Sequence, residues 1–318
     1  MLALLVAGGA YAVHTFGPKF GVYIVPPSPE RYADIALEMM EEGYYAKGAE
    51  WDAARAEVKQ AAIQATNYQE LHAPLAQAAS VAGGKHSFFF TPTEAEALAE
   101  NGSAKFIAPT VSAEAGVTTI TVPELGDVST DQQAEYAEAA VSGISSADAR
   151  TCGWIIDVRG NIGGNMFPML SGVSPLLPNG QALSFVTNTG TKTVVTIQDD
   201  GAGIEGSTLL TIPKMQKVAE RPIAVLQDAR TASSGEAILT AFRGLSGVEF
   251  FGTASAGYTS ANIFHRLHDG AVLVLTSSMY VDRDGTNLKE QPVQPGVEIA
   301  PEQAPQAAID WLNAQGCS

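Results

Sequence analysis

Three largely apolar runs separated by helical segments constrain the fold of this chain more than any other feature. Residues 153–158 (GWIIDV), 221–228 (RPIAVLQD) and 248–253 (VEFFGT) have the composition of strands buried on both faces. Residues 167–177 and 234–245, which lie between them, have helical patterns. Alternating strands and helices predict an α/β layer architecture with right-handed crossovers. In such sheets ligands bind where strand carboxyl ends meet helix amino ends.

The remaining segments divide the chain into a helical part and a mixed part. Residues 28–82 are alanine-rich with helical periodicity, and Ser28, Pro29 and Glu30 form a typical helix start. This segment predicts a small helical subdomain. Beyond residue 84, short β-branched and aromatic runs predict strands at 86–90, 104–111, 116–125 and 271–282, a hairpin of 182–188 with 192–200, and helices at 130–144 and 304–315.

Charge and composition exclude several classes of function. The 318 residues include 18 basic and 34 acidic side chains, a net charge of −16. Such a surface repels nucleic acid and anionic headgroups, so no nucleic-acid partner is expected. The sequence has no CxxC, no HExxH and no Cys/His cluster, so neither a metal nor another cofactor is predicted.

The two cysteines and the amino terminus bear on location. Cys152 and Cys317 could form a disulfide or remain two buried thiols, and the sequence leaves both open. Residues 2–13 are apolar or small, too short a run to span a bilayer, and similar to the apolar part of a secretory signal. We therefore expect residues 1–20 to be an export or anchor segment of bacterial type, and the protein to be extracytoplasmic, secreted or membrane-tethered. The alternative is a buried amino-terminal helix.

A glycine-rich loop follows the first buried run, in the sequence IIDVRGNIGGN. Glycines let backbone N–H groups face a ligand, and a following helix adds the positive end of its dipole. The loop could therefore bind phosphate or an oxyanion, although it lacks the lysine of a P-loop and the GxGxxG pattern. The alternative is a tight strand–helix turn in which Asp157 and Arg159 form an ion pair.

The stretch TASSGEA follows the second buried run and also allows two interpretations. Ser233 and Glu236 have the S-x-x-E spacing of a helix capping box. The same corner would expose the Ser233 hydroxyl as a nucleophile. It would also leave the N–H of Ser234 free to donate to an oxyanion.

A third motif, GGKHSFF, contains His86 between two glycines and a strand. The order of HSFF, IIDVRGNxGG, TASSGE and FFGTxxAGYT resembles the S41 family of serine peptidases, which includes the C-terminal processing and tricorn-type proteases. The resemblance covers roughly residues 80–300. It implies a crotonase-like α/β core preceded by a helical subdomain, and hence an export or anchor segment at 1–20, helices at 21–84 and a peptidase core at 85–318.

The resemblance implies a role for each matching residue. Ser233 would be the nucleophile, with oxyanion-hole amides from Ser234 and from Gly163 or Gly164. Tyr258 stands where the Ser–Lys branch of the family has its lysine, and tyrosine is a poor base near neutral pH.

The tricorn-type Ser–His–Glu arrangement fits better. It implies that His86 is the general base and that Glu290 orients it. Lys85 would be a fallback base. Tyr258 and Asn161 are expected to contact substrate.

The predicted function is therefore a serine peptidase that hydrolyses peptides or unfolded proteins through an acyl-enzyme, without a metal. Residues 90–150 are too few for an additional PDZ domain beside the elements expected there. Two alternatives remain. One is a non-catalytic module of the same fold that binds hydrophobic ligands or peptides, as the retinoid-binding repeats do. The other is a CoA-thioester enzyme, which the acidic charge disfavours.

Overall fold

The structure is a computed structural model that describes Gly17 and residues 21–103, 106–213 and 217–317. The predicted export segment lies, apart from Gly17, outside the described residues. The described chain divides into two compact units. The first contains the described residues up to Glu100 with Thr187–Thr189 and Ala261–Ser278, and the second contains the rest. Among the described helices, none combines the length and apolar character that a membrane crossing requires.

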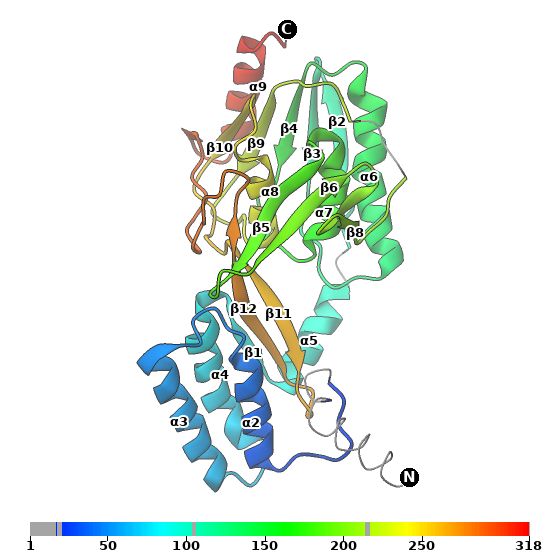
Figure 1. The fold of residues 1–318 in the computed structure, drawn as a ribbon. Helices are drawn as coiled ribbons and strands as arrows, with labels where there is room; N and C mark the ends of the chain where they lie inside the picture. The colour runs from blue at the N-terminus through cyan, green and yellow to red at the C-terminus, as the bar shows by residue number, and fades with distance from the viewer. Residues whose placement is uncertain (1–16, 18–20, 104–105, 214–216, 318) are drawn as a thin grey trace. The chain divides into compact units, whose positions relative to one another are not determined.

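The first unit begins with three helices, as the alanine-rich periodicity predicts (Figure 1). Ser28 caps the first of them by accepting a hydrogen bond from the Arg31 N–H at 3.2 Å. The helices are α2 (Pro29–Met40), α3 (Gly48–Gln64) and α4 (Gln69–Gly83). A short 3-10 helix, η2 (Gly84–His86), then leads into a strand.

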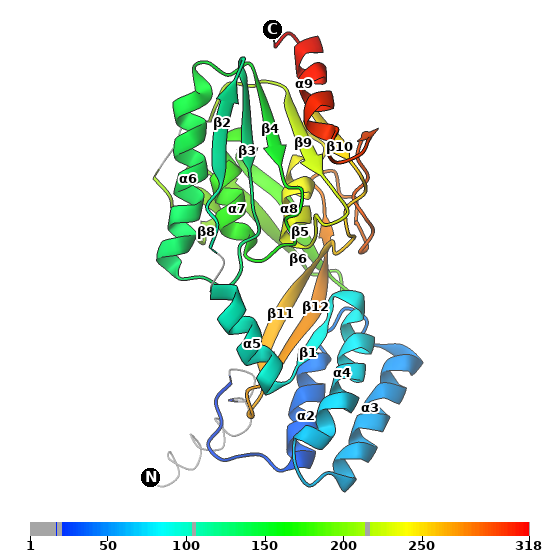
Figure 2. The ribbon, with the colours of Figure 1, turned by 180° about the vertical axis from the view of Figure 1, so that it is seen from behind.

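Strands distant in the sequence complete this first unit (Figure 2). They are β1 (Phe88–Phe90) and the greater part of β11 (Ser260–Arg266) and of β12 (Val272–Val281). Helix α5 (Pro92–Ser103) follows β1. β1 pairs with β12 in antiparallel register, Phe88 opposite Val274. The hairpin of β11 and β12 shares one apolar core with the helices, to which it contributes Leu267, Ala271, Leu273 and Leu275.

The second unit is built on a six-stranded, mostly parallel sheet of order β13-β10-β9-β4-β3-β2 (Figure 1). Only β2 runs antiparallel to its neighbour. The three predicted buried runs form adjacent strands β4, β9 and β10, which confirms their assignment. The strands are β2 (Thr110–Glu114), β3 (Val117–Thr121), β4 (Gly153–Asp157), β9 (Ile223–Gln227), β10 (Val248–Gly252) and β13 (Val297–Glu298).

Helices cover this sheet, and a smaller group of antiparallel strands accompanies it. Helix α9 (Ala304–Ala314) contributes Ala308 and Leu312 to an apolar cluster that also includes Ile155 of β4. The other helices of the unit are α6 (Thr130–Asp148), α7 (Met166–Val173) and α8 (Ser234–Phe242), with η3 (Ser174–Leu176) after α7. The antiparallel strands are β5 (Gly180–Thr187), β6 (Lys192–Gln198), β7 (Gly201–Ile204) and β8 (Ser207–Thr208).

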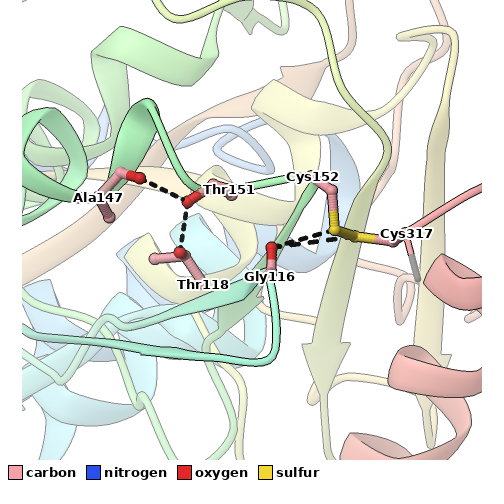
Figure 3. Close-up of a disulfide and its surroundings, with 6 residues drawn as sticks. All are labelled: Gly116, Thr118, Ala147, Thr151, Cys152 and Cys317. Atoms are coloured by element: carbon pink, nitrogen blue, oxygen red, sulfur yellow. Dashed lines mark hydrogen bonds between the residues drawn. A yellow bond between two sulfur atoms is a disulfide. The ribbon is translucent and has the colours of Figure 1, made fainter.

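A disulfide joins Cys152 to Cys317, which settles the alternative that the sequence leaves open (Figure 3). Cys152 directly precedes β4, and Cys317 lies three residues beyond α9. Beside the disulfide, the hydroxyls of Thr118 and Thr151 lie 2.6 Å apart, and Thr151 donates to the Ala147 carbonyl. The segment after α9 is thereby joined covalently to the residue that precedes β4, one of the two middle strands of the sheet.

The sequence expectations fail at a few edge elements. The strand expected at 104–111 begins only at Thr110. Helix α5 and strands β7, β8 and β11 are not predicted. The last two turns of α5 contain Asn101 and Gly102, and β7 contains two glycines, so local propensity is weak there.

Candidate active site

Ser233 occupies the sharp corner between β9 and α8. It is the N-cap residue of α8, with φ of 50° and ψ of −114°. A positive φ is uncommon for a residue with a side chain, and it costs on the order of 1–3 kcal/mol. The Ser233 N–H donates to Oε2 of Glu236 at 3.0 Å, so the glutamate part of the predicted capping box forms. Such strain at a helix start is typical of a functional position.

The glycine-rich loop 158–165 lies against this corner. The N–H of Gly160 donates to Asp228, and the N–H of Ala232 donates to the carbonyl of Asn161. A Cβ atom on Gly163 would lie 2.8 Å from the Ser233 Cβ and 3.1 Å from the Ser234 nitrogen. Only glycine allows this approach, which brings the two predicted motifs together.

The amides that could form an oxyanion hole differ in their hydrogen bonds. The Gly163 N–H donates to Oδ1 of Asn161 at 2.9 Å. In residues 106–213 and 217–317, no acceptor faces the N–H of Gly164 or that of Ser234. The Gly164 carbonyl accepts from the Ser234 hydroxyl at 2.5 Å. This pattern favours the N–H of Gly164 over that of Gly163 as the group of the loop that could donate to an oxyanion.

Glu236 is fully buried and receives four hydrogen-bond donors. Oε1 accepts from the Ser255 hydroxyl at 2.5 Å and from the Gly257 N–H at 2.7 Å. Oε2 accepts from the Tyr258 N–H at 2.6 Å in addition to the Ser233 N–H. Burial raises the pKa of Glu236, and the four hydrogen bonds oppose that rise. The carboxylate therefore links the corner at Ser233 to the turn 255–258.

Glu290 lies at the far side of the same turn. It is buried, has φ of 53°, and accepts a hydrogen bond from the Ser260 hydroxyl at 2.8 Å. Thr259 donates to the Gln291 carbonyl at 3.3 Å, so the turn and the segment after Glu290 are joined. Burial and the hydrogen bond from Ser260 hold the carboxylate of Glu290 in one position.

His86 belongs to the first unit, where it ends η2. It is 8% exposed, and its ring lies edge-on to Phe88 with centroids 6.4 Å apart. Its carbonyl accepts from the side chain of Asn262 at 3.1 Å. Burial, with a smaller effect from the charge of Lys85, lowers the pKa of His86 to about 4. The imidazole is therefore neutral at pH 7, as a general base must be.

Two further predicted residues take part in the architecture of the loop and turn. The side chain of Asn161 is buried and donates to the Val122 carbonyl at 2.9 Å, and its oxygen accepts from Gly163. Both of its polar atoms thus hold the loop, and the expected contact with substrate stays a prediction. The half-buried Tyr258 donates its N–H to Glu236.

The ion pair that the sequence offers as an alternative also forms. Arg159 Nη2 lies 2.6 Å from Asp157 Oδ2, and its Nη1 donates to the Pro301 carbonyl. The guanidinium thus braces the base of the loop. Sequence reasoning missed Ser255 and Ser260, because the only signal was their place in SAGYTS. In the part of the chain that the structure describes, no group of three His, Cys, Asp or Glu could hold a metal.

Comparison with known proteins agrees with this architecture. The model of peptidase family S41 matches residues 116–299. The nisin-resistance protein of Lactococcus lactis subsp. lactis is 36% identical over 305 residues, which cover 95% of this chain and 93% of that protein.

Two solved structures are similar over most of the chain. A lipoprotein from Streptococcus agalactiae has a TM-score of 0.79 and 28% identity, covering 92% of this chain and 99% of its own. The photosystem II D1 C-terminal processing protease has a TM-score of 0.60 and 13% identity, covering 87% and 94%. The latter likeness concerns the fold, a mixed α/β core with amino-terminal helices. The chain belongs to peptidase family S41 and is a hydrolase of that family.

Proposed function

We propose that this peptidase cleaves its substrates through an acyl-enzyme formed on Ser233. The observation that carries the proposal is the close approach of Gly163 to Ser233 at the start of α8. It sets a strained serine beside two backbone amides, those of Ser234 and Gly164, that can stabilise a developing oxyanion. A binding module or a CoA-thioester enzyme does not require this combination.

His86 is proposed to take the proton of the Ser233 hydroxyl, with Glu290 as the carboxylate of the triad. The resemblance of the HSFF and KEQPVQPG segments to the family supports both roles. The neutral imidazole of His86 and the buried carboxylate of Glu290 are consistent with them. The proton then passes from His86 to the leaving amine, and water completes the hydrolysis.

The proposed substrate is an extracytoplasmic peptide, with nisin as the first to test. The full-length similarity to the nisin-resistance protein supports the peptide. The disulfide supports the compartment, since such bonds persist in oxidising environments. The relative described as a lipoprotein supports attachment to a membrane through the amino-terminal segment.

A fluorophosphonate probe and a nisin digest test the proposal together. We expect the probe to label the wild type and Ser234→Ala but not Ser233→Ala. In the nisin digest, we expect mass spectrometry to detect cleavage products with the wild type and none with Ser233→Ala or His86→Ala. Labelling that survives Ser233→Ala would move the nucleophile elsewhere. Labelling without nisin cleavage would retain the mechanism and exclude this substrate. Full activity in His86→Ala would remove the histidine from the mechanism.

A further inference from the structure

We propose that Glu236 is a positioning residue that acts as an ionised clamp on the nucleophile, beyond its role as a helix cap. The inference rests on the proposed role of Ser233. It concerns a side chain that lies three residues after the nucleophile and is 0% exposed. Its carboxylate fixes the backbone on both sides of the reacting hydroxyl.

The donors around Glu236 come from two separate segments. One, the Ser233 N–H, belongs to the strained corner itself. The other three belong to the turn that follows β10, namely the Ser255 hydroxyl and the N–H groups of Gly257 and Tyr258. The Ser255 oxygen also accepts from the Val293 N–H at 2.7 Å, and its own hydrogen points to Glu236. Glu236 therefore faces three backbone N–H groups, which cannot accept a hydrogen bond, and one hydroxyl.

Three fixed N–H donors and a hydroxyl favour an ionised carboxylate. Each carboxylate oxygen offers two lone pairs, and each oxygen of Glu236 accepts two hydrogen bonds. Glutamine would replace one of these oxygens by an NH2 group, and in either orientation its hydrogens would face at least one backbone N–H donor. A buried donor that loses its acceptor costs roughly 1–3 kcal/mol. Ionisation of Glu236 is thus part of the geometry of the corner.

A capping box at the start of α6 shows that an amide can serve in an ordinary cap. At the start of α6, the Ser129 N–H donates to Oε1 of Gln132 at 3.2 Å, in an exposed position. An amide suffices there, because the side chain accepts from only one backbone segment, the start of α6. Glu236 instead joins the nucleophile to the turn of Tyr258 and, through Ser260, to Glu290. This attachment to a second segment distinguishes Glu236 from an ordinary cap.

The test compares Glu236→Gln with Gln132→Ala, the matched loss of a cap at α6. For Glu236→Gln we expect kcat on a peptide substrate to fall on the order of 10- to 100-fold with little change in KM, since small misplacements of a nucleophile have effects of this size. The rate of fluorophosphonate labelling at Ser233 should fall by a similar factor. Gln132→Ala should lower the thermal midpoint while kcat and labelling remain at the wild-type level.

A wild-type kcat in a folded Glu236→Gln protein would overturn the proposal, because a simple cap tolerates an amide. An equal loss of kcat in Gln132→Ala would overturn it as well, because activity would then follow stability alone. Should Glu236→Gln fail to fold, Ser255→Ala carries the test. This variant retains the carboxylate of Glu236 and removes one of its hydrogen-bond donors, so we expect kcat to be several-fold lower. An unchanged kcat would contradict the clamp. Absence of labelling in wild type would instead reject Ser233 as nucleophile, which separates the two failures.

Discussion

The hydroxyl of Ser234 donates a hydrogen bond to the carbonyl oxygen of Gly164, 2.5 Å away. The residue after the proposed nucleophile thus holds the glycine loop through its side chain, while we propose that its N–H donates to the oxyanion. Removing the hydroxyl leaves the amide in place and releases the loop. A neutral hydrogen bond of this kind stabilises by about 0.5–1.5 kcal/mol.

We therefore expect Ser234→Ala to be labelled by a fluorophosphonate and to have a kcat about 3- to 10-fold below wild type, measured by steady-state hydrolysis of a peptide. Ser234→Thr, which keeps a hydroxyl, should recover part of the loss. Complete loss of labelling in Ser234→Ala would assign the nucleophile to Ser234.

A methyl group at Gly163 should disable the site. Its carbon would meet the Ser233 Cβ at 2.8 Å, and the residue has φ of +113°, where side chains are disfavoured. Displacing the loop should lower kcat/KM on the order of 10²- to 10³-fold, the usual effect of losing one oxyanion donor. Gly160→Ala is the control, since Gly160 also has positive φ, at +73°, but nothing within 4 Å of an added Cβ. Similar losses in both variants would attribute the effect to backbone strain alone.

The buried His86 predicts a specific dependence of stability on pH. Its folded-state pKa, about 4, lies below the value of 6.5 expected for an unfolded chain. Between these values the unfolded chain binds a proton that the folded protein excludes, so the free energy of unfolding falls as pH drops from about 6.5 toward 4. His86→Asn should reduce this fall, as measured by urea unfolding at about pH 7.5 and about pH 5. An unchanged pH dependence would show that other groups account for it.

The same pKa bears on catalysis. A base that stays neutral to about pH 4 should sustain kcat/KM well below pH 6.5, so the acidic limb of the pH–rate profile should lie near the folded-state value. Lys85→Met removes the neighbouring positive charge and should move that limb to higher pH. A limb near 6.5 in wild type would contradict the buried environment of His86.

The disulfide should contribute to stability without affecting chemistry. Cys152 and Cys317 are 165 residues apart in sequence, and loss of a native disulfide typically costs about 2–5 kcal/mol. Cys317→Ser should therefore lower the thermal midpoint by several degrees, whereas kcat measured at about 25 °C should be retained. Dithiothreitol should shift wild type to the same midpoint and leave the variant unchanged. A variant with the wild-type midpoint would show that the α9 packing alone suffices.

Much of the second unit follows from local sequence. The runs 153–158, 221–228 and 248–253 are apolar throughout their centres, and only a sheet covered on both faces buries such segments. The corner at Ser233 follows from the S-x-x-E spacing after such a run. The hairpin of β5 and β6 follows from two β-rich runs separated by a short polar turn.

What the sequence does not show are pairings between distant residues. Nothing near Glu236 in sequence indicates that Ser255 and Tyr258 surround it, because those donors lie about twenty positions away. The disulfide is similarly hidden, since two cysteines alone give no distance. The occupied amide of Gly163 also depends on the side-chain orientation of Asn161, which spacing cannot predict.

The first unit also has an order of assembly built into its chain. Helices α2, α3 and α4 end by residue 83, but Leu267, Ala271, Leu273 and Leu275, which share their apolar core, are synthesised almost two hundred residues later. A ribosome therefore releases α2, α3 and α4 with one apolar side uncovered. That side stays open until most of the second unit has emerged.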